Sequence, residues 1–393
     1  IMAETILILG NGFDIAMGRK TKYTDFIEFE QRLFDRPESD LQAFLDYKNI
    51  DIDNYKDNLY LKFINENKDT LGDNWSNLET MISQLADAIM YLKENSSLLY
   101  SNQFNRPLAS IIKQHKIDWR MSANYSSKLY IAGIFLSLFD EKYWSSLERE
   151  VALDKLNNEF IRQLDLLIEL LEIYLSYLDY LDFEVSKIKA KPTALDAVSN
   201  ISNSYVLNFN YTNTSGHLFG TFEEKTHFIH GRIDLDRTFN RINTMVFGIE
   251  DKENDVNSDL IPYQKYYQRV VKETGIKFEM FFLSKYFVEK LHASGIEKSF
   301  PHERKVAKNI IIFGHSVDPL DKEIFQKCFA LAEEGEYPYR FIFTYFDESA
   351  KHSIVKNLAI ILGKEKLIQL TGSRNVVFVK SDDKDGMKEV LLP

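Results

Sequence analysis

The chain has 393 residues and a formal net charge of −11, with 45% hydrophobic and 27% charged residues, which is typical of a globular protein with a sizeable core. Its length fits two domains, or one large domain with an insertion. The acidic balance argues against a surface for duplex nucleic acid, because phosphate neutralisation requires a basic face. The single cysteine excludes an internal disulfide, and the eight histidines lack the cysteine pairs of a zinc module, so we expect no metal site.

We expect a soluble, cytoplasmic protein. The apolar run from Ile6 to Leu9 is too short for the core of a signal peptide, and the polar Asn11 and Asp14 follow it closely. The sequence also lacks an apolar stretch long enough to span a membrane. These features predict no targeting segment and no membrane partner.

The first predicted element is a buried strand, Thr5–Leu9, which ends at a glycine-containing turn. An apolar run without polar alternation is typical of a strand buried on both faces. The turn Gly10-Asn-Gly-Phe-Asp14 would let backbone amides approach an anionic ligand, because glycine has no Cβ. It lacks the third glycine of a dinucleotide fingerprint and the Lys-Ser or Lys-Thr of a P-loop, so a plain tight strand exit stays open.

A helical segment follows this turn. From about residue 40 to 190 glycine and proline nearly vanish, and apolar residues recur at helical spacing. We therefore predict a helical insertion over residues 40–190, with helices near 75–89, 129–139 and 144–181. The last helix has a long apolar face, which predicts burial against neighbours or a homo-oligomer. That face carries Leu164, Leu167, Leu171, Tyr174 and Leu178.

Strands return from Ser204. Short apolar runs at 205–209, 227–229, 245–247, 309–313, 340–345 and 375–379 predict strands, and the later runs alternate with helical stretches at 320–333 and 349–362. This order predicts an α/β, Rossmann-like fold with a mostly parallel sheet covered by helices. Residues 1–39 and 191–393 would form the sheet domain around the large helical insertion. The acidic, Asn-containing residues 250–259 predict a mobile loop.

Four strand ends carry polar or glycine-rich motifs. They read Gly10-Asn-Gly-Phe-Asp14, Asn208-Phe-Asn-Tyr-Thr-Asn213, Ile229-His-Gly231 and Phe313-Gly-His-Ser-Val-Asp318. In this order, and with Trp75-Ser-Asn-Leu-Glu79, they resemble the bacteriophage abortive infection AbiH family over most of the chain. The resemblance implies antiphage defence by abortive infection, with a phage or defence-system protein as the trigger.

The same motifs resemble, more distantly, the sirtuin-like NAD-binding domains. This resemblance implies that Gly10 and Gly12 bind phosphates, that Asn210 lies beside the nicotinamide ribose, and that His230 is the base. It also implies that Gly314 and Ser316 hold the other end of the nucleotide.

The chain departs from the sirtuin-like pattern in three respects. Asp14 stands near the position of a small hydroxyl residue, and Thr212 replaces the aspartate that is common after Asn-Tyr. The zinc ribbon of the sirtuins is absent, which argues against protein deacylation and favours simple hydrolysis of NAD.

We therefore predict an effector that binds a nucleotide and hydrolyses NAD, its substrate and not a bound cofactor, at the nicotinamide–ribose bond. Breaking this bond develops positive charge on the sugar, and a histidine can accept a proton near neutral pH. The alternative is a non-catalytic nucleotide-sensing or partner-binding defence module. The predicted catalytic residues are Asn210 and His230. The predicted nucleotide-binding residues are Gly10, Asn11, Gly12, Phe13, Asp14, Asn208, Thr212, Gly231, Gly314, His315, Ser316 and Asp318.

Structural roles stay open for several of these residues. Asparagine side chains often close turns, which applies to positions 208, 210 and 213, and aspartates such as Asp14 and Asp318 often cap helices. His230 could be a buried histidine at a strand end, and Trp75 with Glu79 could belong to an ordinary helix face.

Two other chemistries also fit parts of the sequence. Gly314-His-Ser-Val-Asp318 resembles the nucleophile elbow of a serine hydrolase, with Asp347 and His352 downstream, but its final glycine is replaced. His227 and His230 suggest a metal, although residues three apart on a strand point to opposite faces.

Overall fold

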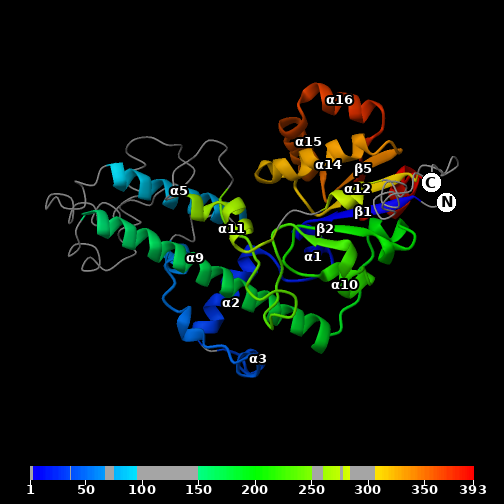
Figure 1. The fold of residues 1–393 in the computed structure, drawn as a ribbon. Helices are drawn as coiled ribbons and strands as arrows, with labels where there is room; N and C mark the ends of the chain where they lie inside the picture. The colour runs from blue at the N-terminus through cyan, green and yellow to red at the C-terminus, as the bar shows by residue number, and fades with distance from the viewer. Residues whose placement is uncertain are drawn as a thin grey trace, which may run out of the picture. The chain divides into compact units, whose positions relative to one another are not determined.

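The fold of the chain, a computed structural model, is shown in Figure 1. The structure describes residues 3–35, 37–66, 75–94, 149–249, 260–274, 278–283 and 306–393. Two compact units are present: Ile1–Thr21, Leu178–Arg232 and Gly275–Pro393 form the first, and Lys22–Tyr177 and Ile233–Thr274 form the second. The predicted insertion at 40–190 overlaps the second unit, and its boundaries stay a prediction. The predicted helix at 129–139 and the predicted loop at 250–259 lie outside the described residues.

The first unit is built on a six-stranded, all-parallel sheet with the strand order β3-β2-β1-β4-β5-β6. This confirms the predicted α/β, Rossmann-like fold. β1 is central, and its last residue, Leu9, pairs with Asn208 on one side and Phe313 on the other. The strands are β1 (Glu4–Leu9), β2 (Tyr205–Asn208), β3 (Thr226–Phe228), β4 (Lys308–Phe313), β5 (Tyr339–Tyr345) and β6 (Val376–Lys380).

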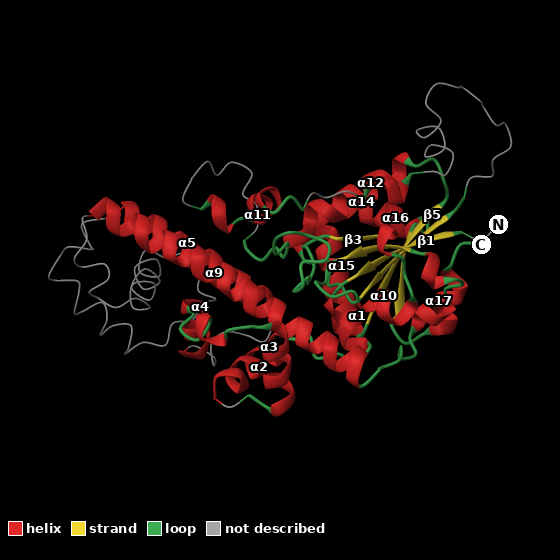
Figure 2. Ribbon diagram, turned by 60° about the horizontal axis from the view of Figure 1, so that its bottom comes forward, coloured by secondary structure: helices red, strands yellow, loops and turns green. Residues whose placement is uncertain are grey.

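Helices cover both faces of this sheet (Figure 2). Ile6 and Ile8 of β1 face one helical layer, whereas Leu7 and Leu9 face the other, which explains why the strand is apolar without alternation. The first layer contains α12 (Glu279–Phe282), α14 (Lys322–Glu334), α15 (Glu348–Leu362) and α16 (Lys364–Gly372). The second contains α1 (Asn11–Ala16), α10 (Thr214–Phe219) and α17 (Lys384–Val390).

The regular elements described in the second unit are helices. It holds α2 (Tyr23–Asp35), α3 (Ser39–Lys48), α4 (Leu59–Glu66), α5 (Trp75–Glu94), α11 (Lys265–Val271) and all but the end of α9 (Arg149–Asp179). The apolar face of α9 is covered within the single chain, because Leu164, Leu167 and Leu171 are buried and Tyr174 packs on Phe26 and Phe29. Leu178 is buried as well. The physical reason for predicting a homo-oligomer through this face is therefore wrong.

The predicted strand at 245–247 is also wrong. Met245, Val246 and Phe247 are buried, as their apolar character implies, but their backbone is irregular. The amide and carbonyl of Phe247 bond to the side chain of Gln268, at 3.0 and 2.9 Å. A glutamine amide thus replaces the neighbouring strand as the hydrogen-bond partner, which no apolar pattern can reveal.

The turns that follow β1 and β4 pack against each other through glycines. The Gly10 amide donates to the carbonyl of Phe313 at 3.0 Å, and the Gly12 amide donates to that of Gly314 at 2.8 Å. A Cβ on Gly10 would lie 2.4 Å from the Gly314 oxygen, and one on Gly12 would lie 2.7 Å from the Gly314 Cα. Each is a backbone contact that cannot relax by turning a side chain. The three glycines are required by this close approach.

We expect Gly314→Ala to destabilise the first unit by more than about 2 kcal/mol, since it adds a steric clash to backbone strain. Gly314 has φ +70°, and its Cβ would lie 2.1 Å from the Phe13 nitrogen. Gly372→Ala is the matched control, because a Cβ there meets no heavy atom within 4 Å among the described residues. The control should change stability by no more than about 1 kcal/mol. Denaturant unfolding measures both, and equal midpoints would contradict the packing explanation.

Candidate functional site

The carboxyl ends of β1 and β4 mark the switch point of the sheet. β2 and β3 lie on one side of β1, and β4, β5 and β6 lie on the other. The helix after β2 packs on one face and the helix after β4 packs on the opposite face. In open α/β sheets, ligands bind outside the strand ends at such a point. The polar residues at this edge are therefore the candidate site.

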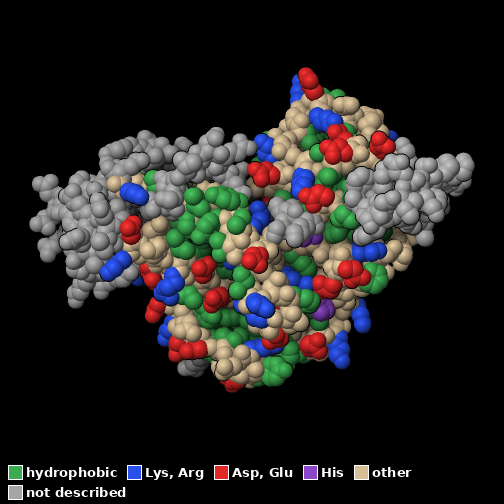
Figure 3. All heavy atoms as spheres, viewed as in Figure 1, with side chains coloured by type: hydrophobic (Ala, Val, Ile, Leu, Met, Phe, Trp, Pro, Cys, Tyr) green, Lys and Arg blue, Asp and Glu red, His purple; other side chains and the backbone are tan. Residues whose placement is uncertain are grey.

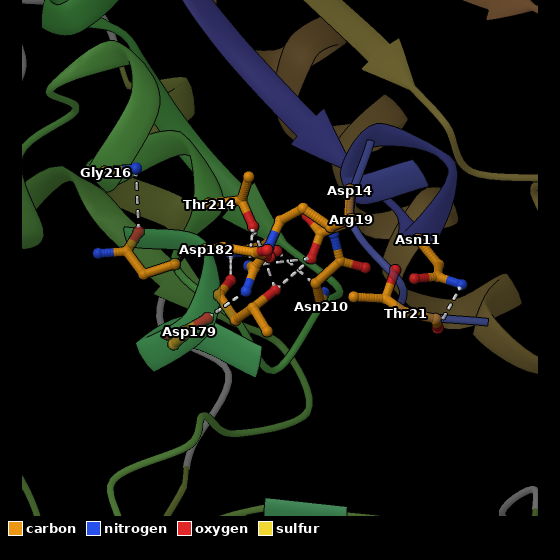
Figure 4. A network of polar contacts seen from close by, with 12 residues as sticks. Asn11, Asp14, Arg19, Thr21, Asp179, Asp182, Asn210, Thr214 and Gly216 are labelled. Carbon is orange, nitrogen blue, oxygen red and sulfur yellow. Dashed lines mark hydrogen bonds and ion pairs between the residues drawn. The ribbon is translucent and has the colours of Figure 1, made fainter. Parts of the chain in front are cut away.

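Asp14, on α1 just after β1, is the buried centre of a polar network (Figure 4). The Thr212 hydroxyl donates a short hydrogen bond to Asp14 Oδ2, and the Asn210 amide donates to Asp14 Oδ1 at 3.3 Å. Arg19 Nη1 lies 3.7 Å from Oδ2. Arg19 also donates to Thr214 Oγ1 at 2.6 Å, and the Thr214 hydroxyl lies 3.4 Å from that of Thr212. The aspartate is thus held both directly and through two hydroxyls.

The buried guanidinium of Arg19 connects this network to the end of α9 and the π-helical turn Tyr180–Val185. It donates to Asp179 and, at 2.8 Å, to Asp182 Oδ2. The ring of Phe183 covers the guanidinium at 4.7 Å, and His217 stacks on that ring at 4.0 Å. Arg19 therefore faces three carboxylates.

Burial dominates the titration of the carboxylates around Arg19. Burial raises the pKa of Asp14 to about 6, and the charge of Arg19 and the hydrogen bonds from Thr212 and Thr214 only partly offset it. Burial also raises the pKa of Asp179, against the charge and hydrogen bond of Arg19. Burial alone would lower the pKa of Arg19, but the charges of Asp179 and Asp14 outweigh it and raise it. Asp14 is thus a carboxyl that changes charge near neutral pH.

The asparagines after β2 have different roles. Asn208 closes the turn, because its Oδ1 accepts from the Asn210 amide at 2.9 Å and its Nδ2 donates to the Thr212 carbonyl at 2.8 Å. Asn213 caps α10 by accepting from the Gly216 amide. Asn210 instead donates from Nδ2 to the Gly10 carbonyl at 2.9 Å as well as to Asp14. Two acceptors on one side fix the orientation of its amide group.

A second cluster joins His230, after β3, to His315, after β4. Asp321 Oδ1 lies 3.3 Å from His230 Nε2, and Asp321 Oδ2 lies 3.3 Å from His315 Nε2. The Phe209 ring packs edge-on against both imidazoles and stacks on Phe325. One nearly buried carboxylate is therefore shared by two histidines.

The turn that carries His315 is strained. Gly314 has φ +70° and Val317 has φ +58°, a conformation rarely adopted by β-branched residues. Val317 is fully buried, and its amide donates to His315 Nδ1 at 2.8 Å. Ser316 is exposed at the turn, and its carbonyl accepts from Asn357. Asp318 caps the 3-10 turn Pro319–Asp321.

The serine-hydrolase alternative is not supported by this geometry. Asp347 Oδ1 accepts from the Ala350 amide and caps α15, while His352 is exposed on that helix. Positive φ falls on Gly314 and Val317, not on the candidate nucleophile Ser316. The histidine and carboxylate that approach this turn are His230 and Asp321 instead.

The remaining predicted residues are placed as follows. Asn11 Nδ2 donates to the Thr21 carbonyl at 3.1 Å, and Phe13 is buried against Phe219 and Phe313, where its side chain packs the core. Gly231 turns the chain after β3 with φ +79°.

In the second unit, Trp75 packs on Tyr23 and Phe26, and Glu79 pairs with Lys265 at 3.0 Å. These contacts give Trp75 and Glu79 structural roles.

The structure thus brings Asp14, Asn210 and Thr212 together in one cluster, and His230 and His315 together in another. Asp14 follows β1 on the face covered by α1 and α10, whereas Phe209 and the histidines beside it adjoin the face covered by α14. Sequence reasoning missed Arg19, Asp179, Asp182, Thr214 and Asp321. Asp318-Pro-Leu-Asp321 could be recognised as a helix start, but not as the partner of two histidines.

No group of three or more His, Cys, Asp or Glu side chains in the described ranges is arranged to hold a metal ion. Within the same ranges we find no helix whose length and apolar character would let it cross a membrane.

The fold and the edge residues define an α/β protein with a Rossmann-like parallel sheet and a cluster of polar residues at its switch point. The family model of Bacteriophage abortive infection AbiH matches residues 6–343. The chain belongs to this family, which assigns it to defence against phage by abortive infection. No curated protein and no solved structure matches the chain.

We expect Asp14 to make stability depend on pH. Its folded pKa of about 6 lies above the ordinary aspartate value of about 3.9, so the folded state binds this proton more tightly. The resulting stabilisation is complete below about pH 4 and is lost as the pH rises through about 6. Between pH 4 and 7 the parent should lose about 3 kcal/mol relative to Asp14→Asn. Denaturant unfolding across this range measures the difference, and parallel pH profiles would contradict the assignment.

Proposed function

We propose that the first unit binds a nucleotide at the carboxyl edge of β1, β2 and β4 and hydrolyses NAD as the effector step of abortive infection. The observation that carries this proposal is the strand order, with its switch point between β1 and β4. Sheets with this order bind dinucleotides across that point. At the carboxyl edge of the sheet, Asp14 follows β1, Asn210 follows β2, His315 follows β4, and His230 follows the edge strand β3.

The reaction breaks the bond between C1′ of the ribose and the nicotinamide nitrogen. The bonding electrons pass to that nitrogen, which becomes neutral, and a water oxygen bonds to C1′. One proton is released from the water and needs an acceptor. The transition state has positive charge on the sugar, as in glycoside hydrolysis, so nearby carboxylates stabilise it. Asp14 is the buried carboxylate of this edge.

Asn210 is proposed to position the water or a ribose hydroxyl. Its Nδ2 donates to the Gly10 carbonyl and to Asp14, so Oδ1 points away from both acceptors. Among the described residues Oδ1 has no hydrogen-bond donor, and the side chain is half-buried. An amide fixed in this way presents an acceptor to a ligand without reorganising.

His230 is proposed to accept the proton. It lies after β3, its side chain is nearly buried, and Asp321 lies 3.3 Å from its Nε2. A carboxylate beside an imidazole orients the ring and stabilises the imidazolium. Gly10, Gly12, Gly314 and Ser316 are proposed to face the rest of the nucleotide. The amides of Gly10 and Gly12 already donate to carbonyls of the protein. These glycines would therefore contribute to binding by leaving room for the nucleotide, and not by donating hydrogen bonds to it.

The second candidate function is nucleotide sensing without turnover. This function is favoured because the two proposed catalytic residues contact different carboxylates. Asn210 donates to Asp14, whereas His230 lies beside Asp321. In either case a phage or defence-system protein is the proposed trigger. Figure 3 shows acidic and basic side chains interspersed on the described surface of one face, which does not favour a duplex nucleic acid as partner.

Purified protein incubated with NAD should release nicotinamide, and Asn210→Ala and His230→Ala should each lower kcat more than they raise KM. Loss of a general base predicts a decrease on the order of 10²–10⁴-fold for His230→Ala. The double variant should lose much less than the product of the two single effects, because both residues serve one step. Nicotinamide release measured by chromatography gives kcat and KM.

Two control variants match these substitutions. Asn213→Ala removes the cap of α10 within the same motif, and His352→Ala removes an exposed histidine on α15. Both should keep kcat within about twofold. No nicotinamide release by a parent protein that binds NAD in a titration would favour the sensor, and full activity of His230→Ala would remove it from the mechanism.

A further inference from the structure

Asp321 occupies the N-cap position of α14 but does not act as a cap. Its side chain makes no capping hydrogen bond to that helix. By contrast, Asp347 and Asp383 at the N-caps of α15 and α17 both accept from a backbone amide. An aspartate at an N-cap usually accepts from a backbone amide of its helix, so the lack of this bond at Asp321 needs an explanation. The carboxylate of Asp321 instead faces His230 and His315.

The protonation of His315 follows from its neighbours. The Val317 amide donates to His315 Nδ1 at 2.8 Å, so this nitrogen carries no proton. In a neutral imidazole the proton is then on Nε2, which faces Asp321 Oδ2 at 3.3 Å. Adding a proton to Nδ1 would require the buried Val317 amide to lose its acceptor. The hydrogen bond to Nδ1 therefore places the proton of the imidazole on Nε2, which faces Asp321.

The strain of the β4 turn supports this arrangement. Val317 adopts φ +58° although it is β-branched and fully buried. Such strain persists only where the surroundings impose it, and it is common at functional sites. Here the unusual backbone directs the Val317 amide at His315 Nδ1.

The same carboxylate sets the orientation of His230. Asp321 Oδ1 lies 3.3 Å from His230 Nε2, and a carboxylate beside one imidazole nitrogen favours the tautomer that carries its proton on that nitrogen. The rings of Phe209 and Phe325 enclose the cluster, and all three polar side chains are nearly buried. An apolar enclosure strengthens the imidazole–carboxylate interaction.

We propose that Asp321 is a positioning residue, which fixes His230 with Nε2 protonated so that Nδ1 accepts the proton released in hydrolysis. His315 is the second histidine that contacts this carboxylate, and it keeps the carboxylate in place. The role of His230 rests on the proposed function, whereas the protonation pattern of the two histidines does not. The test therefore has two readouts.

The first readout is the side-chain nitrogen NMR of the full chain labelled with ¹⁵N-histidine. In the parent, His230 and His315 should both show a protonated Nε2 and an unprotonated Nδ1, with assignments from His230→Gln and His315→Gln. In Asp321→Ala, His230 should become a mixture of tautomers, whereas His315 should keep its pattern because Val317 still holds it. An unchanged His230, or a His315 protonated at Nδ1 in the parent, overturns the proposal.

The second readout is nicotinamide release. Asp321→Ala should lower kcat by at least about 10²-fold with KM nearly unchanged, and Asp321→Glu should restore part of the loss. Asp383→Ala, which removes a true N-cap, is the control and should keep kcat. Asp321→Asn keeps the shape of the side chain and replaces the alanine variant if that variant unfolds.

The outcomes distinguish failure of the proposed NAD hydrolysis from failure of the proposed role of Asp321. A parent that releases no nicotinamide but shows the expected tautomers contradicts the proposed hydrolysis and supports Asp321 as the residue that orients His230. An active parent whose Asp321→Ala variant keeps full kcat, while His230→Ala is inactive, overturns the role of Asp321.

Discussion

The contact between the turns after β1 and β4 is the constraint on which the first unit depends. Gly10 and Gly12 lie so close to Gly314 that any Cβ would overlap backbone atoms. The two amides of the first turn donate to the carbonyls of the second, which extends the β1–β4 pairing beyond the strands. Because this contact lies at the switch point, it fixes the starting points of α1 and of the turn that carries His315. Both polar clusters are positioned from these two turns.

Charge is distributed differently in the two clusters. Around Arg19, three aspartates face one guanidinium, so the site has more negative than positive groups, and burial raises the pKa of Asp14 to about 6. Around Asp321, one carboxylate faces two imidazoles. The first cluster can supply a negative charge to a developing cation, and the second can take up a proton. These are complementary requirements of the hydrolysis that we propose at a positively charged sugar.

The sequence predicted the sheet well because its signals are local. Apolar runs indicate buried strands, and each of the six strands of the sheet lies within one residue of its predicted range. The run at 245–247 shows the limit of this signal, since burial alone does not decide the backbone partner, and Gln268 supplies it. The long apolar face of α9 shows the same limit: the pattern required a covering surface, but only the folded chain revealed that its own helices provide it.

The sequence by itself determined the family, the parallel sheet and the strand ends that carry polar residues, since these depend on residue type and spacing. Only the tertiary structure decided what each polar residue does. Asn208 and Asn210 are two residues apart, yet one closes a turn and the other bonds to Asp14. Arg19 and Asp179 are 160 residues apart, and no local pattern links them. A polar side chain takes its role from its hydrogen-bond partners, and the fold brings those partners together from distant parts of the chain.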